Sequence, residues 1–247
     1  SGWGSSFQTL DMGDMGVFSF DSTAGALVGI TANDDLLPTA YEEAATGVSS
    51  TGISGVGSTN VIGYRNTFGM FSVSAGYSQL GTSTAESASG GEADHGSITD
   101  IYVSVSPIDG LTIGAGHAEN TSTDTSTTST DTTSMVAQAV YSTGPVSFGY
   151  RVAEDNNGTA GTASRVIEAM SVAFNVNDNF AISYGVQDTE VEAISATAAV
   201  TEEVTGISAA YTSGAASVRV NHSKADNDNG VTGVDDETTE VSLVLSF

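Results

Sequence analysis

The stretch "FSVSAGYSQ" (residues 71–79) alternates between two kinds of side chain. Phe71, Val73, Ala75 and Tyr77 occupy every second position, and serine or glycine fills most positions between them. Successive side chains of a β-strand point to opposite faces of a sheet, so this period predicts a strand with one apolar and one small polar face. A helix would space its apolar residues differently.

The same alternation extends over most of the chain. The segments that show it are 60–66, 100–105, 111–117, 145–152, 180–186, 207–211 and 216–222, and the C-terminal "EVSLVLSF" (240–247). Two further segments, 134–141 and 165–174, alternate less cleanly and are also predicted to be strands, the second with Glu168 in phase with Met170. A strand around Leu10 completes a predicted total of twelve, one before the longest connection and eleven after it.

The connections between these strands alternate in length. Short ones with turn chemistry lie near 66–67, 107–110, 142–144, 175–179 and 212–215. Long ones rich in Ser, Thr, Asp, Asn and Gly lie near 80–97, 119–133, 153–165, 188–203 and 223–238. Short connections of this kind form hairpins, so the pattern predicts an antiparallel up-and-down meander with one tight end and one end of long polar loops.

The longest connection comes first, over residues 13–58, within a single domain of residues 1–247. Connections of this length in a compact domain are usually functional or disordered. It contains Pro38 followed by good helix formers, which predicts a short helix near 38–45. It is also acidic, and its carboxylates include Asp14, Asp21, Asp34, Asp35, Glu42 and Glu43.

The composition excludes several classes of function. The 247 residues include 30 acidic and 5 basic residues, a formal net charge of −25. Such a chain lacks the Lys and Arg that bind nucleic acid or dock on anionic lipid. It has no cysteine, so disulfides and thiolate chemistry are excluded. No stretch approaches the length of about 20 apolar residues that a membrane helix needs.

The two faces of the predicted strands favour a transmembrane barrel. The apolar face carries Val, Ile, Leu and Ala, with Phe and Tyr near strand ends, as suits the two interfaces of a bilayer. The opposite face is mostly Ser, Gly, Ala and Thr, which suits a water-filled interior better than a dense core. A soluble sandwich that buries its apolar faces against each other stays open as the alternative.

At this point the chain resembles the general diffusion porins of Gram-negative outer membranes, especially those of alphaproteobacteria. The resemblance rests on "TLDMGD" (9–14), the acidic long loop, the alternation of short and long connections, and the terminal "VSLVLSF" (241–247). It implies an integral outer-membrane protein, a homotrimer without cofactor, that lets small hydrophilic solutes diffuse through a water-filled pore. It also implies that Phe247 lies in the periplasmic interface and serves as an insertion tag.

The resemblance implies sixteen strands, so we expect the sequence to lack the first four strands of such a barrel. A complete twelve-stranded outer-membrane barrel, acting as an enzyme, adhesin or specific channel, is the alternative. A soluble, secreted acidic β-protein is a third possibility. The chain has three histidines, His95, His117 and His222, for any Ser–His–Asp chemistry, but we expect no enzyme.

The candidate site residues are charged. If the long loop folds inward, as the resemblance implies, Asp34, Asp35, Glu42 and Glu43 line the narrowest part of the pore. By strand phase the basic residues Arg65, Arg151 and Arg219 point away from the apolar face, and we expect them on the pore wall. The acidic excess predicts a mild cation preference. Acidic loops such as 224–230 could bind Ca²⁺, although an EF-hand spacing is missing.

Overall fold

The computed structural model describes residues 7–21, 28–48, 52–56, 60–79, 96–121, 131–157, 163–192 and 199–246. Thirteen strands form one sheet in this part of the chain. They are β1 (Phe7–Asp11), β2 (Val17–Asp21), β3 (Val61–Phe68), β4 (Phe71–Gln79), β5 (Ser97–Ile108), β6 (Leu111–Thr121), β7 (Thr132–Thr143), β8 (Val146–Asn157), β9 (Arg165–Asn177), β10 (Phe180–Val191), β11 (Val200–Ser213), β12 (Ala216–Asp226) and β13 (Asp236–Leu245).

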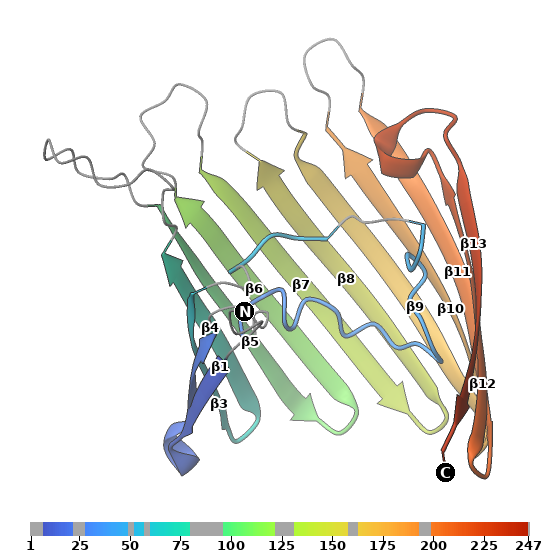
Figure 1. Cartoon of the computed structure of the whole chain (residues 1–247), viewed down its shortest axis with the longest axis horizontal. Coiled ribbons are helices and arrows are strands. Elements are labelled where there is room, and N and C mark those ends of the chain that lie inside the picture. Colours follow the sequence, from blue (N-terminus) through green and yellow to red (C-terminus); the bar gives the residue numbers. More distant parts are fainter. Residues whose placement is uncertain are drawn as a thin grey trace, which may run out of the picture.

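Each strand pairs antiparallel with the next one in sequence, from β1 to β13, so the sheet is a simple meander (Figure 1). This confirms the predicted all-β, up-and-down architecture. It also confirms the two irregular strands, which are β7 and β9. The sheet is open, with β1 and β13 as its two edges. It curves so that the two edges flank a hollow, and chain segments run across this hollow (Figure 1).

The N-terminal region corrects the predicted strand count. Eleven strands follow the long loop, as expected, but two strands precede it rather than one. Residues 13–15 make a tight 3-10 turn in which Gly13 and Gly16 take φ values of 64° and 90°, and the chain then returns as β2. Whether further strands precede Ser1 stays a prediction.

The long loop therefore begins later than expected. The predicted boundary at residue 13 is wrong, because β2 pairs with β1 on one side and with β3 on the other, where Val17 lies opposite Arg65. Asp14, counted among the loop carboxylates, belongs to the β1–β2 turn instead. This hairpin is hard to recognise in the sequence, because each of its two strands has only five residues and a short turn with glycines separates them.

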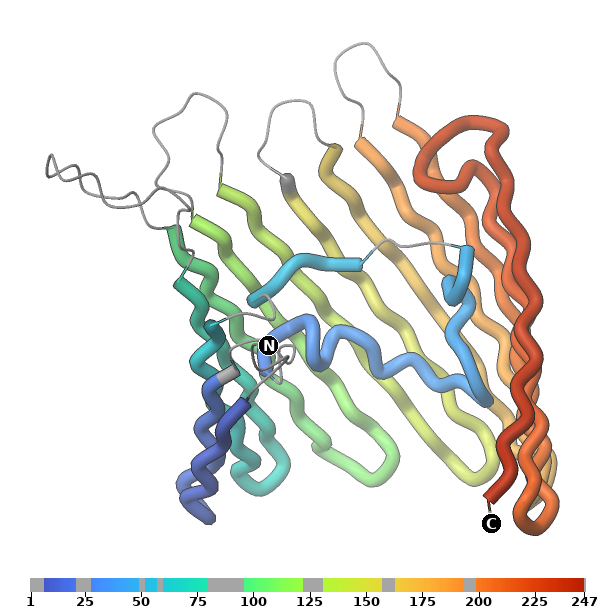
Figure 2. The backbone as a smooth tube through the Cα atoms, in the orientation of Figure 1, coloured from blue at the N-terminus to red at the C-terminus, as the bar shows by residue number. Residues whose placement is uncertain are grey.

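The two faces of the sheet differ as the alternation predicted. One face carries exposed apolar side chains along its whole width, among them Phe71, Ile101, Phe148, Tyr184 and Leu243. On the other face, buried Ser, Gln and Asn side chains follow the same strands. We call this second face the inner face, because the long loop lies on it (Figure 2).

The described parts of the loop, residues 28–48 and 52–56, form what we call the strap. Its outgoing limb (28–41) crosses the inner face toward β13, and its return limb (42–48 and 52–56) comes back toward β5 (Figure 2). The buried apolar residues cluster between strap and sheet. The clusters are Ile30, Ile53, Tyr102, Ala118, Val136, Ala153 and Ile167; Val28, Val56 and Val61; and Val48, Val204 and Ala225. The described core therefore lies inside the hollow.

The short helix expected near 38–45 is absent, since these residues form an extended segment followed by a turn. The sheet takes the backbone groups that a helix would use. The Ala40 amide donates to Ser183 Oγ at 2.9 Å, and Ser171 Oγ donates to the Pro38 carbonyl at 2.9 Å. Good helix formers follow tertiary contacts when these satisfy the backbone. No helix in the described ranges is long and apolar enough to span a membrane.

Candidate functional site

The strap is fixed to the sheet at its near end by one carboxylate. Asp100 of β5, only 4% exposed, accepts the Ile30 amide at 2.6 Å through Oδ1 and the Val56 amide at 3.1 Å through Oδ2. Beside it, the Gly29 amide donates to Ser74 Oγ at 2.8 Å. Asp100 thus holds the outgoing and the return limb together where both meet the wall.

Gln138 of β7 holds the middle of the outgoing limb. Its Oε1 accepts the Leu36 amide at 2.9 Å, and its Nε2 donates to the Asn33 carbonyl at 2.6 Å. The same Nε2 lies 2.9 Å from the Tyr102 hydroxyl. A buried amide that satisfies both its donor and its acceptor in this way fixes the height of the strap above the sheet.

Next to this contact, the structure brings together three of the predicted site residues. Arg151 of β8, 5% exposed, places its guanidinium nitrogens 3.7 Å from Asp34 Oδ2 and 3.5 Å from Asp35 Oδ2. Burial raises the pKa of Asp34, and the Arg151 charge acts in the opposite direction. Two strap carboxylates therefore share one buried wall cation.

Glu43 on the return limb adds a third carboxyl to this group. The Glu43 side chain keeps contact with solvent, yet desolvation by the surrounding protein has the largest effect on its carboxyl. This desolvation, followed by a hydrogen bond with Asp35 and the negative charge of that residue, raises the pKa of Glu43 to about 8. Near neutral pH Glu43 is mostly protonated, so the proton relieves the excess of negative charge around Arg151.

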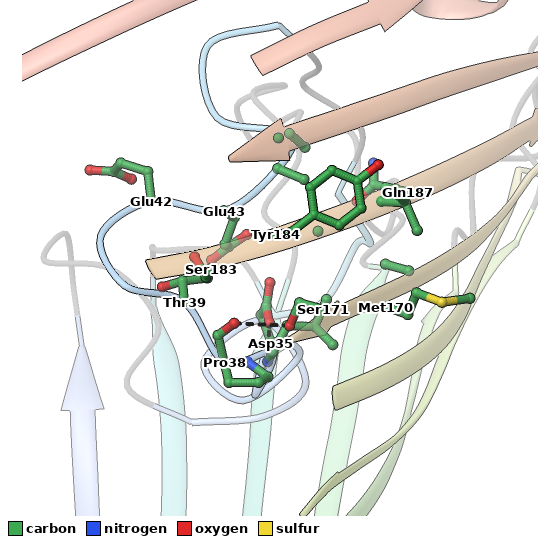
Figure 3. Close-up of a pocket in the computed structure, with 17 residues that line it drawn as sticks. Asp35, Pro38, Thr39, Glu42, Glu43, Met170, Ser171, Ser183, Tyr184 and Gln187 are labelled. Atoms are coloured by element: carbon green, nitrogen blue, oxygen red, sulfur yellow. Dashed lines mark hydrogen bonds between the residues drawn. The ribbon is translucent and has the colours of Figure 1, made fainter. Parts of the chain in front are cut away.

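Glu42 differs from its neighbour. Its carboxylate points away from the strands (Figure 3) and is 3.4 Å from Thr46 Oγ1 within the strap. A small cavity between the strap and β9–β11 is lined by Asp35, Glu42 and Glu43 on the strap side. Among the carboxylates of Asp35, Glu42 and Glu43, the one of Glu42 is therefore directed away from the wall.

Tyr41 fastens the far end of the strap to the last strands. Its amide donates to Ser208 Oγ of β11 at 3.2 Å, and its hydroxyl hydrogen bonds with the Glu240 carboxylate of β13. This hydrogen bond raises the pKa of the Tyr41 hydroxyl. The guanidinium carbon of Arg219, on β12, is 5.6 Å from the centre of the Tyr41 ring, a cation–π contact. The tyrosine therefore covers a second wall cation.

Two glycines of the wall allow the strap to approach closely. A side chain at Gly149 would meet Pro38 Cδ at 2.5 Å, and one at Gly206 would meet the Ala44 Cα at 2.4 Å. Neither distance is possible for a real Cβ, so the absence of a side chain at both positions is what admits the strap.

Arg65, the third predicted wall cation, lies elsewhere. It is exposed on β3 and lines a cavity of about 600 Å³ between the strap and β2–β5. No ion pair joins it to a strap carboxylate in the part of the chain that the structure describes. Arg151 is therefore the wall arginine that forms ion pairs with the strap carboxylates, and a pore-wall role for Arg65, Arg151 and Arg219 stays a prediction.

Other sequence candidates lie away from the strap. His117 is exposed and His222 is half-buried on the outer face, where His222 Nδ1 lies 2.9 Å from Thr239 Oγ1. His95 and Phe247 lie outside the described residues. Among the described residues no three His, Asp or Glu side chains are arranged to hold a metal ion. Ca²⁺ binding by acidic loops stays a prediction.

The sequence analysis did not identify several of the residues that hold the strap in place. Asp100, Gln138 and Tyr41 are the main ones, together with the serines at 171, 183 and 208. Asp100 and Gln138 are larger polar residues on a face made mostly of small ones, and this contrast is the signal that could have identified them. The serines are so frequent in this chain that no pattern distinguishes those that contact the strap.

Comparisons with known proteins agree with this geometry. The family model described as Gram-negative porin matches residues 2–247. The chain is a Gram-negative porin. Family membership makes it an integral protein of the outer membrane. No curated protein sequence matches this porin.

Solved structures share the fold of this porin. A porin refined at 1.8 Å resolution superposes with a TM-score of 0.69 at 18% identity, covering 95% of this chain and 79% of that one. OmpT of Vibrio cholerae, expressed in the outer membrane, gives a TM-score of 0.60 at 18% identity, with 92% and 75% covered. A trimer form of OmpT gives 0.59 at 19% identity, with 93% and 74% covered.

Proposed function

We propose that this porin is a passive channel, not an enzyme, through which small hydrophilic solutes and ions diffuse down their gradients. The observation that carries the proposal is the strap. It is held across the inner face from β4 to β13 by hydrogen bonds to wall side chains, and so it narrows the hollow without being part of the sheet. A barrel lined by small polar residues and narrowed in this way selects by size and charge.

The strap carboxylates set the field in the narrowest part of this channel. Asp34 and Asp35 face Arg151, so their charge is partly balanced at the wall. Glu42 points away from the strands and supplies the charge that solutes meet (Figure 3). With Glu43 mostly neutral below pH 8, the strap carries a modest negative excess, which supports the mild cation preference expected from the sequence.

We further propose that the channel is a homotrimer. The support is the likeness to OmpT of Vibrio cholerae, one structure of which is described as a trimer form. Native mass spectrometry of the detergent-extracted protein tests this directly. A mass of three subunits is expected, and a purely monomeric protein that still conducts would refute the trimer while leaving the channel in place.

The channel itself is tested by reconstitution into planar bilayers and liposomes. We expect stepwise ion currents, and liposome swelling whose rate falls as the neutral sugar in the bath grows larger. A variant in which residues 31–47 are replaced by a short Gly-Ser linker should admit larger sugars, because the strap no longer fills the hollow. Absence of current from protein shown to be folded would refute the proposed function.

A further inference from the structure

We propose that the cavity between the strap and β2–β5 is a binding subsite for small zwitterions such as α-amino acids. The inference rests on the proposed function, because the subsite then lies on the path that solutes take. The cavity, of about 600 Å³, contains two charged residues of opposite sign in its lining, Arg65 and Asp14.

The two charges are not neutralised by each other. No ion pair involving Arg65 or Asp14 is found within the described residues, which means that the nearest charged atoms of the two are more than 4.0 Å apart. Both residues are exposed to the cavity. Two unpaired, opposite charges that share one water-filled space favour a solute that carries both a carboxylate and an ammonium group.

The backbone fixes where each charge lies. Arg65 is on β3 directly opposite Val17 of β2 and Ser74 of β4. Asp14 lies in the turn that leads into β2, and its carbonyl accepts a hydrogen bond from Asn66 Nδ2 at 3.1 Å. The turn is thereby tied to the strand that carries Arg65, so the backbone positions of the two charged residues are linked.

A buried hydroxyl completes the subsite on the side of Arg65. Ser74, 8% exposed, lies directly opposite Arg65 on β4 and belongs to the lining of the cavity. Ser74 Oγ already accepts the Gly29 amide, so the hydroxyl keeps its hydrogen to donate, which suits the carboxylate end of the solute. The Tyr102 hydroxyl is directed toward Gly114 of β6 and Gln138 of β7, away from Arg65.

The remaining wall cations cannot replace Arg65 in this role. Arg151 is engaged by Asp34 and Asp35, and Arg219 lies under the Tyr41 ring. Arg65 is the one basic residue in the lining of this cavity. A solute carboxylate in this cavity therefore pairs with Arg65, and Asp14 in the same lining receives the ammonium group.

The test measures binding of L-alanine to the detergent-solubilised protein by calorimetry. Propionate, which lacks the ammonium group, and ethylamine, which lacks the carboxylate, serve as probes with a single charge. We expect alanine to bind about tenfold more tightly than either, since one charge-assisted hydrogen bond contributes about that factor. Arg65→Gln and Asp14→Asn should each weaken alanine binding by about the same factor, and Arg65→Lys should retain part of the binding.

Lys224→Gln is the matched control, because it removes one positive charge on an exposed residue outside this cavity. It should bind alanine like the unaltered protein, and an unchanged heat-dependent mobility shift on gels verifies that each variant is folded. Equal affinity of alanine, propionate and ethylamine, or alanine binding that persists in both variants, would overturn the subsite. Charge-dependent binding by a protein that carries no current would uphold the subsite and refute the channel.

Discussion

Arg151 is the residue on which the charge balance of the strap depends. Arg151 is buried and forms ion pairs with Asp34 and Asp35. Its positive charge also acts on the Glu43 carboxyl, whose pKa it lowers. Desolvation of Glu43, followed by its hydrogen bond with Asp35 and the negative charge of that residue, raises the pKa of Glu43, and the Arg151 charge opposes this only in part. The strap is therefore held by an ion-pair group whose net charge depends on pH.

Arg151→Gln should loosen the strap. Removing one partner of a buried ion pair costs roughly 3–5 kcal/mol, and we expect about 3 because both aspartates retain some exposure. The free energy of unfolding in detergent measures this loss, and the reversal potential in a KCl gradient should move toward higher cation selectivity. Arg219→Gln is the control, since its cation–π contact with Tyr41 contributes only about 0.5–1 kcal/mol. Equal effects of both variants would contradict the special position of Arg151.

The charge of Glu43 predicts a dependence on pH. Its folded-state pKa of about 8 lies above its usual 4.5, so its stabilising contribution is complete below pH 4.5 and is lost as the pH rises through 8. Over the same range the strap gains a negative charge, and cation selectivity should increase. The reversal potential measured from pH 6 to 9 tests this. Glu43→Gln should remove the step near pH 8, whereas Glu42→Gln should leave it; a step that persists without Glu43 would assign it to another group.

The strap, as an element, is held by many weak contacts and a few close approaches. Serine hydroxyls of successive strands receive or supply backbone hydrogen bonds along its outgoing limb, and glycines at 149 and 206 let it lie flat. Each hydrogen bond contributes only about 1 kcal/mol. Because there are many such hydrogen bonds, together they hold the strap against the wall.

Removal of three of these hydroxyls should free the far half of the strap. In a variant with Ser171→Ala, Ser183→Ala and Ser208→Ala, the amides of Ala40 and Tyr41 lose their acceptors. Their hydrogen exchange should accelerate by at least about tenfold, as follows from a loss of 1–2 kcal/mol of local protection. Ser147→Ala is the control, because its hydrogen bond to Ser142 is remote from the strap. Unchanged exchange at both amides would show that other contacts hold the strap.

A disulfide can test whether the strap stays on β13. A Cβ built on Gly47 is 3.5 Å from the Cβ of Thr238, within the range of disulfide geometry, and the chain has no other cysteine. Gly47→Cys with Thr238→Cys should oxidise readily, although φ of 80° at residue 47 costs about 1–2 kcal/mol. Single-channel current should be the same before and after reduction. An increase on reduction would mean that the strap leaves β13 in the working channel.

The sequence predicts the strands much better than the strap. Alternation identified β3 to β13, because each strand has one face against lipid and one toward the hollow. Apolar and polar side chains therefore alternate from one residue to the next. The loop has no such period. The path of the loop depends on Asp100, Gln138 and the wall serines, which are far from it in the sequence. The helix expected after Pro38 does not form because the backbone there makes hydrogen bonds with the wall instead. Arg151 was found because a charge on the apolar face would be costly.

At the scale of the whole molecule, the apolar residues are divided between two places. The outer face exposes them to lipid, and the described core lies between the strap and the inner face. The chain carries a net charge of −25, so we expect the field in the hollow to be negative except close to Arg65, Arg151 and Arg219.

This field should be sensitive to salt. The Debye length falls from about 10 Å at 0.1 M to about 3 Å at 1 M, so exposed carboxylates act on a passing ion only at low ionic strength. Cation selectivity, measured from reversal potentials at a fixed KCl ratio, should therefore be clear near 0.1 M and nearly vanish near 1 M. Selectivity that stays constant over this range would point to direct ion coordination at the strap instead.

The position of the core also determines the order in which the protein can assemble. The strap precedes β3 to β13 in the sequence, but Tyr41 and Gly47 dock on β11 to β13, which are synthesised much later than the strap. Val48 of the strap has no apolar partners until β11 and β12 have joined the wall, whereas Ile30 and Ile53 pack against earlier strands. Contacts between such distant parts of a chain form slowly, so the strap should be the last part to settle and the part most in need of a chaperone beforehand.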